Sequence, residues 1–323
     1  MKARELGAAR AIVASRIRGT RVPVFVGAAV TSRCDGVCVF CRRAGGNGDD
    51  LDTRTWMELL EGMARAGTCR VSFTGGEPLL RDDVGRLVHE ARRLGLGVNI
   101  STNGQLLDSR LEEIARADGV TVSFEGPEPV MDRLRGRDAH AKAVRGIEAA
   151  LGAGLPLVLR STLSSLNVDR VDEILAEART LGARVSFAPL RSVPLGGGDP
   201  ALLPEESLFR VAVERLIQQK RRGDRTVLNS MACLEHYRRW PEPAVLRCSA
   251  GRIYARVEPD GWMYACGDEV TSARRESALD LGFEEAFRRI EPSGCDACWC
   301  DSRVEMNLLH DLNVHAIREA LHR

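Results

Sequence analysis

The chain has 323 residues, of which 44% are hydrophobic and 28% are charged, and its formal net charge at pH 7 is +1. This composition is typical of a globular protein with a core of ordinary size, and the near-neutral charge argues against nucleic acid as a partner. No run approaches the roughly 18 apolar residues of a membrane span, and no signal peptide is evident, so we expect a cytoplasmic protein.

The first element expected is an amphipathic helix over residues 2–18, which carries five basic residues. Such a helix either lies on a membrane surface or closes one end of a barrel. The second role is the commoner one. Membrane association therefore stays an alternative.

Six short apolar runs follow, separated by segments with helical periodicity. This alternation predicts parallel β/α units, and the space they occupy is shorter than the about 250 residues of a complete eight-unit barrel. We therefore expect an α/β fold built on a partial (β/α)6 TIM-like barrel. The predicted strands are Val24–Val30, Arg70–Phe73, Gly97–Thr102, Val120–Phe124, Leu157–Leu163 and Arg184–Leu190.

The pattern changes after a glycine-rich loop at 196–200 and a predicted helix over 205–222. A hairpin turn at Glu258–Gly261 is expected between strands at 253–257 and 262–265. One final helix should carry Val304, Leu308, Leu312 and Ile317 on one side. The expected divisions are an N-terminal helix (1–22), the barrel (23–223), a cysteine-rich module (224–302) and a C-terminal helix (303–323).

Three cysteines, Cys34, Cys38 and Cys41, directly follow the first predicted strand. In a parallel barrel this is the rim where active sites lie. Three thiolates suit an iron–sulfur cluster that leaves one iron open. A zinc site closed by a remote fourth ligand such as Cys69 is the alternative.

The spacing C-x3-C-x2-C, with Phe40 before the last cysteine, resembles the signature of the radical S-adenosylmethionine (SAM) superfamily. Further motifs in the same order strengthen this resemblance: Thr74–Pro78 (TGGEP), Ser101–Gly104 (STNG) and an Arg-Gly element at Arg135. The resemblance covers residues 24–220. It implies a [4Fe–4S] cluster on the three cysteines and SAM bound to the open iron.

The resemblance also implies which residues contact the cofactor. The glycine pair and the Glu77 carboxylate are expected at the methionine amino group, and the STNG element near the ribose. Glu125 stands where the family usually has Asp, which makes Ser123 the safer contact. Arg135 either binds the SAM carboxylate or is solvated. The residues expected at the cofactor are Phe40, Gly75, Gly76, Glu77, Pro78, Ser101, Asn103, Ser123, Arg135 and Arg160.

A second group of cysteines looks like the Twitch module, the short form of the SPASM extension. Carried over, Cys248, Cys266, Cys295 and Cys298 would hold an auxiliary [4Fe–4S] cluster, with Cys300 as an alternative to Cys298. A four-cysteine zinc ribbon is the competing interpretation. Cys69 is expected to be a buried small hydrophobe, and Cys233 either an inert buried thiol or a hydrogen donor to a substrate radical.

The resemblance implies reductive cleavage of SAM to a 5′-deoxyadenosyl radical, which abstracts hydrogen from an organic substrate. A small natural product or sugar-like alcohol, oxidised or epimerised, is the first expectation. A maturase of ribosomal peptides is the second, because only 33 residues precede Cys34 and leave little room for a leader-binding domain. A lipid-modifying enzyme and a non-enzymatic metal–cysteine scaffold are the remaining alternatives. An external electron donor, such as flavodoxin or ferredoxin, is also expected.

Overall fold

The computed structural model of the chain describes residues 3–41, 50–191, 199–242, 246–269, 274–295 and 297–321. Of the predicted glycine-rich loop at 196–200, residues 196–198 lie outside these ranges. All ten cysteines lie inside them.

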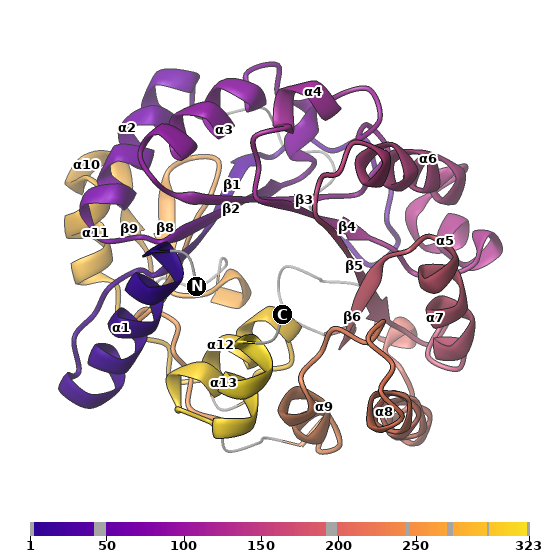
Figure 1. Ribbon diagram of the computed structural model, residues 1–323. Coiled ribbons are helices and arrows are strands. Elements are labelled where there is room, and N and C mark those ends of the chain that lie inside the picture. The colour runs from indigo at the N-terminus through magenta and orange to yellow at the C-terminus, as the bar shows by residue number, and fades with distance from the viewer. Residues whose placement is uncertain are drawn as a thin grey trace.

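Six parallel strands form the centre of the molecule, in the order in which they occur along the chain. Figure 1 shows them as an arc, with helices along its outer side. The strands are β1 (Phe25–Thr31), β2 (Arg70–Gly75), β3 (Gly97–Thr102), β4 (Gly119–Ser123), β5 (Leu157–Leu163) and β6 (Arg184–Pro189). The α/β fold and the partial barrel predicted from the sequence are confirmed.

The helices that cover the arc bury one apolar stripe each. In α3, Val84, Leu87, Val88 and Ala91 are buried, and the helix is followed by Gly95 with a φ of 81°. A left-handed conformation of this kind is the usual way to end a helix. The helices of this layer are α2 (Thr53–Arg65), α3 (Val84–Arg93), α4 (Leu111–Ile114), α5 (Glu128–Arg135), α6 (Ala139–Gly152), α7 (Val171–Thr180) and α8 (Glu206–Arg221).

The cysteine-rich C-terminal part continues the same sheet. Strand β7 (Tyr254–Val257) pairs in parallel with β1, and β8 (Trp262–Tyr264) and β9 (Glu276–Ser277) follow in antiparallel order. The sheet therefore passes without interruption from the barrel into the predicted module. Further helices of this part are α9 (Met231–Tyr237), α10 (Ala278–Leu281), α11 (Phe283–Arg289) and α12 (Asp301–His310).

The C-terminal segment forms two helices, so the prediction of one continuous helix is wrong. Helix α12 ends at His310, and α13 (Val314–Leu321) begins after a turn in which Leu312 has a φ of 56°. This left-handed backbone changes the direction of the chain, so that Leu312 and Ile317 do not extend the stripe of α12.

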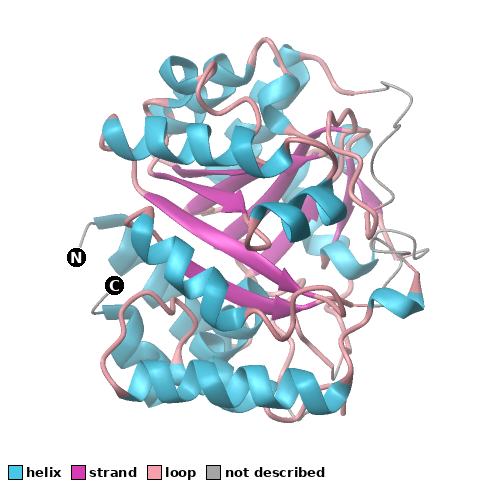
Figure 2. Ribbon diagram, turned by 90° about the vertical axis from the view of Figure 1, so that its right-hand side faces the viewer, coloured by secondary structure: helices cyan, strands magenta, loops and turns pink. Residues whose placement is uncertain are grey.

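The N-terminal helix α1 (Ala3–Arg18) lies at the end of the sheet opposite the arrowheads in Figure 2. Two nitrogens of Arg4 donate to Asp118 at 2.9 and 3.1 Å, just before β4 begins, and Ser15 contacts His310 at 3.2 Å. This position agrees with a helix that closes one end of the barrel. Among the described helices, none combines the length and apolarity needed to cross a bilayer.

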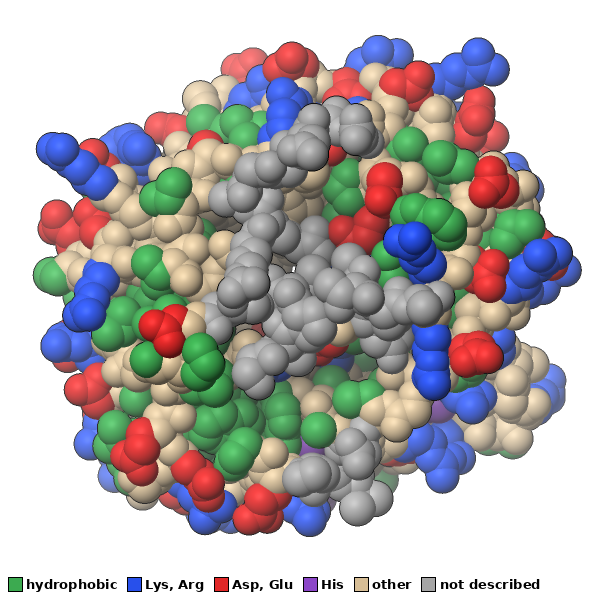
Figure 3. All heavy atoms as spheres, turned by 180° about the vertical axis from the view of Figure 1, so that it is seen from behind, with side chains coloured by type: hydrophobic (Ala, Val, Ile, Leu, Met, Phe, Trp, Pro, Cys, Tyr) green, Lys and Arg blue, Asp and Glu red, His purple; other side chains and the backbone are tan. Residues whose placement is uncertain are grey.

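The concave face of the arc is lined by polar side chains. Ser72, Asn99, Ser101, Thr121 and Ser123 are half-buried, whereas the residues that alternate with them are buried. Because strand side chains alternate between faces, these residues share the inner face. On the face of the molecule seen in Figure 3, the acidic and basic side chains of the described residues are interspersed around the grey atoms.

Candidate metal centres

The first three cysteines are held on a loop at the carboxyl end of β1. A Cβ atom built on Gly36 would lie 3.6 Å from Sγ of both Cys34 and Cys38, so the two sulfurs flank this buried glycine. The backbone N–H of Cys41 donates to the carbonyl of Cys38 at 3.1 Å, so a turn of backbone joins the second and third cysteines. Burial raises the pKa of the Cys34 thiol to about 11. A bound cation would be needed to keep such a thiol ionised at neutral pH.

The glycine pair of TGGEP brings two backbone segments into close contact. A Cβ atom on Gly76 would lie 2.0 Å from the carbonyl oxygen of Arg33, and one on Gly75 would lie 2.2 Å from that of Thr31. The N–H groups of Gly76 and Glu77 donate to these same carbonyls at 2.8 Å. The pair therefore fixes the segment that leads into Cys34, a role that spacing alone does not indicate.

The Glu77 carboxylate lies below this contact and is fully buried. It accepts hydrogen bonds from the backbone of Leu79 (3.0 Å), the backbone of Asn103 (2.7 Å) and the hydroxyl of Thr102 (2.8 Å). Burial nevertheless raises its pKa to about 7. Glu77 thus joins the ends of β2 and β3, and Pro78 starts the short 3-10 turn Pro78–Leu80 behind it.

The STNG element continues this connection toward the cysteine loop. Nδ2 of Asn103 donates to Oδ1 of Asp35 at 2.7 Å, and its Oδ1 accepts from the backbone of Gln105 at 2.8 Å. Ser101 and Ser123 lie on the concave face, where the hydroxyl of Ser101 is 3.3 Å from that of Ser72. Of the predicted cofactor contacts in this region, Asn103 therefore lies beside the cysteine loop, and Ser101 and Ser123 lie on the concave face.

Arg135 is not a solvated charge, because its guanidinium is buried against Glu125. Nε and Nη2 both donate to Oε1 of Glu125, the first at 3.0 Å. Nη1 lies 3.7 Å from Sγ of Cys38, and Cζ lies 5.4 Å from the ring centroid of Phe40. The ion pair thus connects the end of β4 to the cysteine loop.

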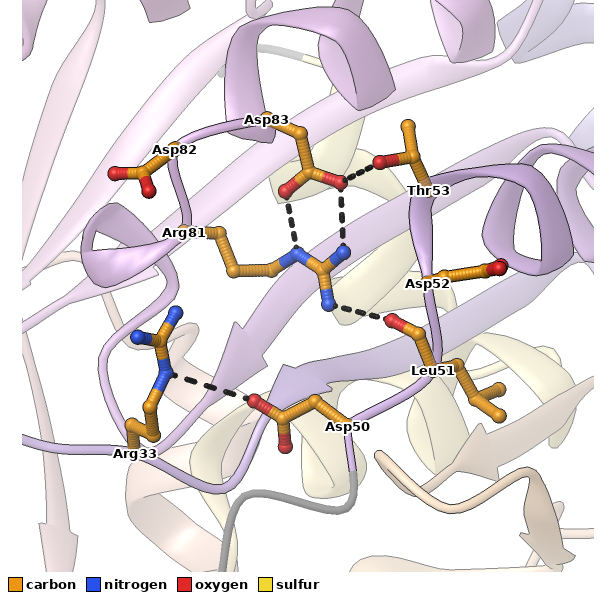
Figure 4. Close-up of a pocket in the computed structure, with 8 residues that line it drawn as sticks. All are labelled: Arg33, Asp50, Leu51, Asp52, Thr53, Arg81, Asp82 and Asp83. Atoms are coloured by element: carbon orange, nitrogen blue, oxygen red, sulfur yellow. Dashed lines mark hydrogen bonds and ion pairs between the residues drawn. The ribbon is translucent and has the colours of Figure 1, made fainter.

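A second buried arginine, Arg81, lies between the segments that carry Asp83 and Leu51, as Figure 4 shows. Arg81 donates to both oxygens of Asp83 at 2.7 Å and to the carbonyls of Val30 (2.7 Å) and Leu51 (2.9 Å). Arg81 thereby links Leu51, which follows the cysteine loop in the chain, to Val30 at the end of β1. The sequence predictions did not include Arg81. Its position three residues after the TGGEP motif is a signal that could have marked it as a candidate.

Four of the five C-terminal cysteines are close enough to influence one another: the thiols of Cys248, Cys266 and Cys300 all act on Cys298. Burial raises the pKa of Cys298 well above its usual value, and the nearby thiols of Cys300, Cys266 and Cys248 raise it further. Burial, followed by the charge of Asp268, raises the pKa of Cys266 to about 12. Cys295 is exposed. The set of Cys248, Cys266, Cys295 and Cys298 stays a prediction, and the proximity of Cys300 to Cys298 makes Cys300 a further candidate ligand.

The segment that carries Cys298 and Cys300 is held by side chains from several elements. The ring of His236 stacks on Trp299 at 4.6 Å, and its Nε2 donates to the carbonyl of Cys298 at 2.8 Å. Directly after Cys300, the buried Asp301 accepts from Arg160 of β5 at 3.0 Å and from Ser186 of β6 at 2.8 Å. Arg160 thus joins the barrel to this segment, a connection that its place on β5 alone could not reveal.

The two remaining cysteines lie apart from these groups. Cys233 is fully buried in α9, and Nδ2 of Asn229 donates to its sulfur at 3.5 Å. This is the environment of an inert thiol rather than of a hydrogen donor that meets a substrate. Cys69 is half-buried rather than buried.

Both cysteine groups fit an iron–sulfur cluster by the chemistry of their donors, because thiolates are the ligands that such clusters use. Within the described ranges, no three His, Cys, Asp or Glu side chains converge as the ligands of one metal ion would. In a cubane each thiolate binds a different iron, so its ligands stand further apart. Cys34, Cys38 and Cys41 would hold one cluster, and Cys248, Cys266, Cys298 and Cys300 a second.

The amino-acid sequence of the chain is similar to a known family and to characterised proteins. Residues 29–178 match the family model "Radical SAM superfamily". The chain is 32% identical to the PqqA peptide cyclase of Gluconobacter oxydans over 258 residues, which cover 76% of this chain and 70% of that protein. It is 29% identical to the mycofactocin maturase MftC of Mycolicibacterium smegmatis over 304 residues, which cover 87% and 76%.

Two solved structures share the fold. SuiB of Streptococcus suis, bound to its precursor peptide SuiA, superposes with a TM-score of 0.68 and 15% identity over 88% of this chain and 75% of that one. The enzyme anSMEcpe, with bound AdoMet and the Kp18Cys peptide, gives a TM-score of 0.64 and 14% identity over 93% and 99%.

Proposed function

The chain belongs to the radical SAM superfamily, and on that premise we propose that it modifies a peptide by radical chemistry. The observation that carries the proposal is the similarity of most of the chain to proteins named as a PqqA peptide cyclase and a mycofactocin maturase. This similarity supports the peptide alternative over the small alcohol or sugar-like substrate expected first from the sequence. A scaffold without activity has no need of the TGGEP and STNG motifs, which are expected from the family resemblance to bind SAM.

The proposed cofactors follow from the two groups of thiols. When bound, the first cluster supplies an electron that cleaves SAM to methionine and a 5′-deoxyadenosyl radical, which takes a hydrogen atom from the substrate. The chain's own contribution is to hold SAM beside the concave face. Gly75 and Gly76 keep the loop close to β2, and Asn103, Ser101 and Ser123 present polar groups at the strand ends.

The substrate segment is proposed to lie along the concave face between the two thiol groups. The half-buried hydroxyls and amides of β2, β3 and β4 can accept and donate hydrogen bonds to a peptide backbone. Arg160 and Asp301 lie between this face and Cys300, where they can orient the segment relative to the auxiliary cluster. A cluster there could accept the second electron of a net oxidation, for example when two carbon atoms are joined with loss of two hydrogen atoms.

The experiment is an anaerobic assay of the reconstituted enzyme with SAM, a low-potential reductant and the short peptides encoded beside its gene. Formation of 5′-deoxyadenosine together with a peptide that has lost two hydrogen atoms, or has gained deuterium from heavy water, supports peptide modification. Deoxyadenosine that forms without any change in these peptides, but with oxidation of a small alcohol, would reject it. Wild-type protein that never cleaves SAM would reject radical chemistry altogether.

A further inference from the structure

The guanidinium of Arg135 contacts several residues around the first group of cysteines. Arg135 closes helix α5, is 9% exposed, and reaches Glu125, Cys38 and Phe40 with one guanidinium. Glu125 is fully buried, and its second oxygen accepts from the backbone N–H of Thr162 at 2.9 Å. Because both charged groups are buried and paired, the guanidinium is held in one orientation.

The backbone around Arg135 also contacts the residues on either side of Cys38. The N–H of Val39 donates to the carbonyl of Leu134 at 3.0 Å. Gly136 has a φ of 104°, and a Cβ atom built on it would lie 2.6 Å from the side chain of Val37. The end of α5 and the turn that carries Cys38 are thus fitted to each other on both sides of the sulfur.

Of the two thiols that flank Gly36, Cys38 has a cation beside it. Cys38 faces Arg135, whose Nη1 is 3.7 Å from the sulfur. A guanidinium remains charged at any working pH, so this cation is permanent.

We propose that Arg135 is a positioning residue that donates a hydrogen bond to the Cys38 thiolate and makes the cluster on this loop easier to reduce. The inference rests on the proposed function, because it requires a cluster on Cys34, Cys38 and Cys41. Reduction adds one negative charge to the cluster, and a fixed cation with a hydrogen bond to a ligand sulfur stabilises that charge. Glu125 is the partner that aims the cation.

The test is the midpoint potential of the cluster, followed by electron paramagnetic resonance in the reconstituted enzyme. Addition of SAM identifies the signal of this cluster, because SAM changes the signal of the iron to which it binds. Arg135→Gln alone would leave a buried, unpaired carboxylate and risks misfolding. The double variant Glu125→Gln/Arg135→Gln removes both charges together, and Arg135→Lys keeps the charge without the planar fork.

We expect the SAM-responsive signal of the double variant to titrate at a lower potential than that of the wild type, and Arg135→Lys to shift less. The matched control is Arg137→Gln, which removes an arginine that is 94% exposed two residues further on and should not shift the potential. The auxiliary cluster should be unchanged in every variant. A folded double variant that loses iron from this site alone supports the positioning role.

A double variant with full iron content and the wild-type potential would overturn the inference while leaving the proposed function intact. A wild-type protein that shows no SAM-responsive signal and forms no 5′-deoxyadenosine would overturn both. These two failures are therefore distinguishable in one set of samples.

Discussion

Nδ2 of Asn103 lies 2.7 Å from Oδ1 of Asp35, so the end of the third strand is joined directly to the first turn of the cysteine loop. The backbone N–H of Asn103 also donates to the Glu77 carboxylate at 2.7 Å. The side chain that the sequence predicted as a cofactor contact therefore also shapes the loop that would bind the cluster.

Asn103→Asp should lower the iron content at the first site and slow SAM cleavage by about 10- to 100-fold, the usual cost of disturbing an outer-shell contact. The reason is that a carboxylate would then face the carboxylate of Asp35. Iron analysis and 5′-deoxyadenosine formation measure the two effects.

Asp35→Asn is the matched control, because its amide oxygen still accepts from Asn103 at the same place. It should retain most of the iron and most of the SAM cleavage. Equal losses in both variants would show that the charge of Asp35, and not its hydrogen bond to Asn103, is what the loop requires.

Gly76→Ala should destabilise the protein by about 1–3 kcal/mol or more, because the new methyl group would lie 2.0 Å from the carbonyl oxygen of Arg33. Both partners are backbone, so neither can move away as a side chain could. Urea unfolding measures the loss. Gly152→Ala, at the end of α6 with nothing within 4 Å of the added atom, should change stability by less than about 1 kcal/mol. Similar losses at both positions would contradict the close-contact argument.

The strands and outer helices could be predicted because their signals are local. Alternating apolar runs and helical stripes repeat along the chain, and each predicted strand overlaps an observed one. The break at Leu312 could not be predicted, because a leucine carries no signal for left-handed backbone. The proposed division at residue 223 remains a prediction, while β7 pairs with β1 in one sheet.

The metal-binding motifs could be predicted from spacing, but their partners could not. Glu125 and Arg135 are ten positions apart, and Arg160 and Asp301 are 141 apart, so only the fold brings each pair together. The familiar C-x2-C spacing also favoured Cys295 and Cys298 as ligands, with Cys300 as an alternative to Cys298. Which thiol turns inward depends on the backbone between them, which the sequence does not reveal.

The buried Glu77 predicts a specific pH dependence of stability. Its pKa is about 7 in the folded chain against an ordinary value of 4.5, so the folded state binds more protons between these values. Stability should therefore fall as the pH rises from about 4.5 to 7, by at most about 1.4 kcal/mol per pH unit, and level off above. Urea unfolding of the iron-free protein across this range gives the slope.

Glu77→Gln should be less stable at low pH, because its amide group would face backbone N–H donors, and it should lack this slope. The difference between the wild-type and variant slopes isolates Glu77 from the other titrating groups. Parallel curves for the two proteins would mean that Glu77 is ionised throughout, stabilised by its three hydrogen bonds.

The proximity of Cys300 to Cys298 gives the last prediction. Cys300→Ala should lower the iron content of the reconstituted enzyme from about eight to about four per chain, since each cluster holds four irons. Cys298→Ala should do the same. Cys295→Ala should retain all the iron, because this thiol is exposed and lies outside the group formed by Cys248, Cys266, Cys298 and Cys300.

Two further features of the segment support this set over the familiar C-x2-C pattern. Cys300 is followed directly by Asp301, whose hydrogen bonds to Arg160 and Ser186 fix the start of α12 against the barrel. The carbonyl of Cys298 is held by His236 at 2.8 Å. Cys69→Ala is the control for removal of a half-buried thiol and should keep the full iron content. If Cys295→Ala loses four irons and Cys300→Ala keeps them, the segment must turn over when the cluster binds, and the ligands are then Cys248, Cys266, Cys295 and Cys298.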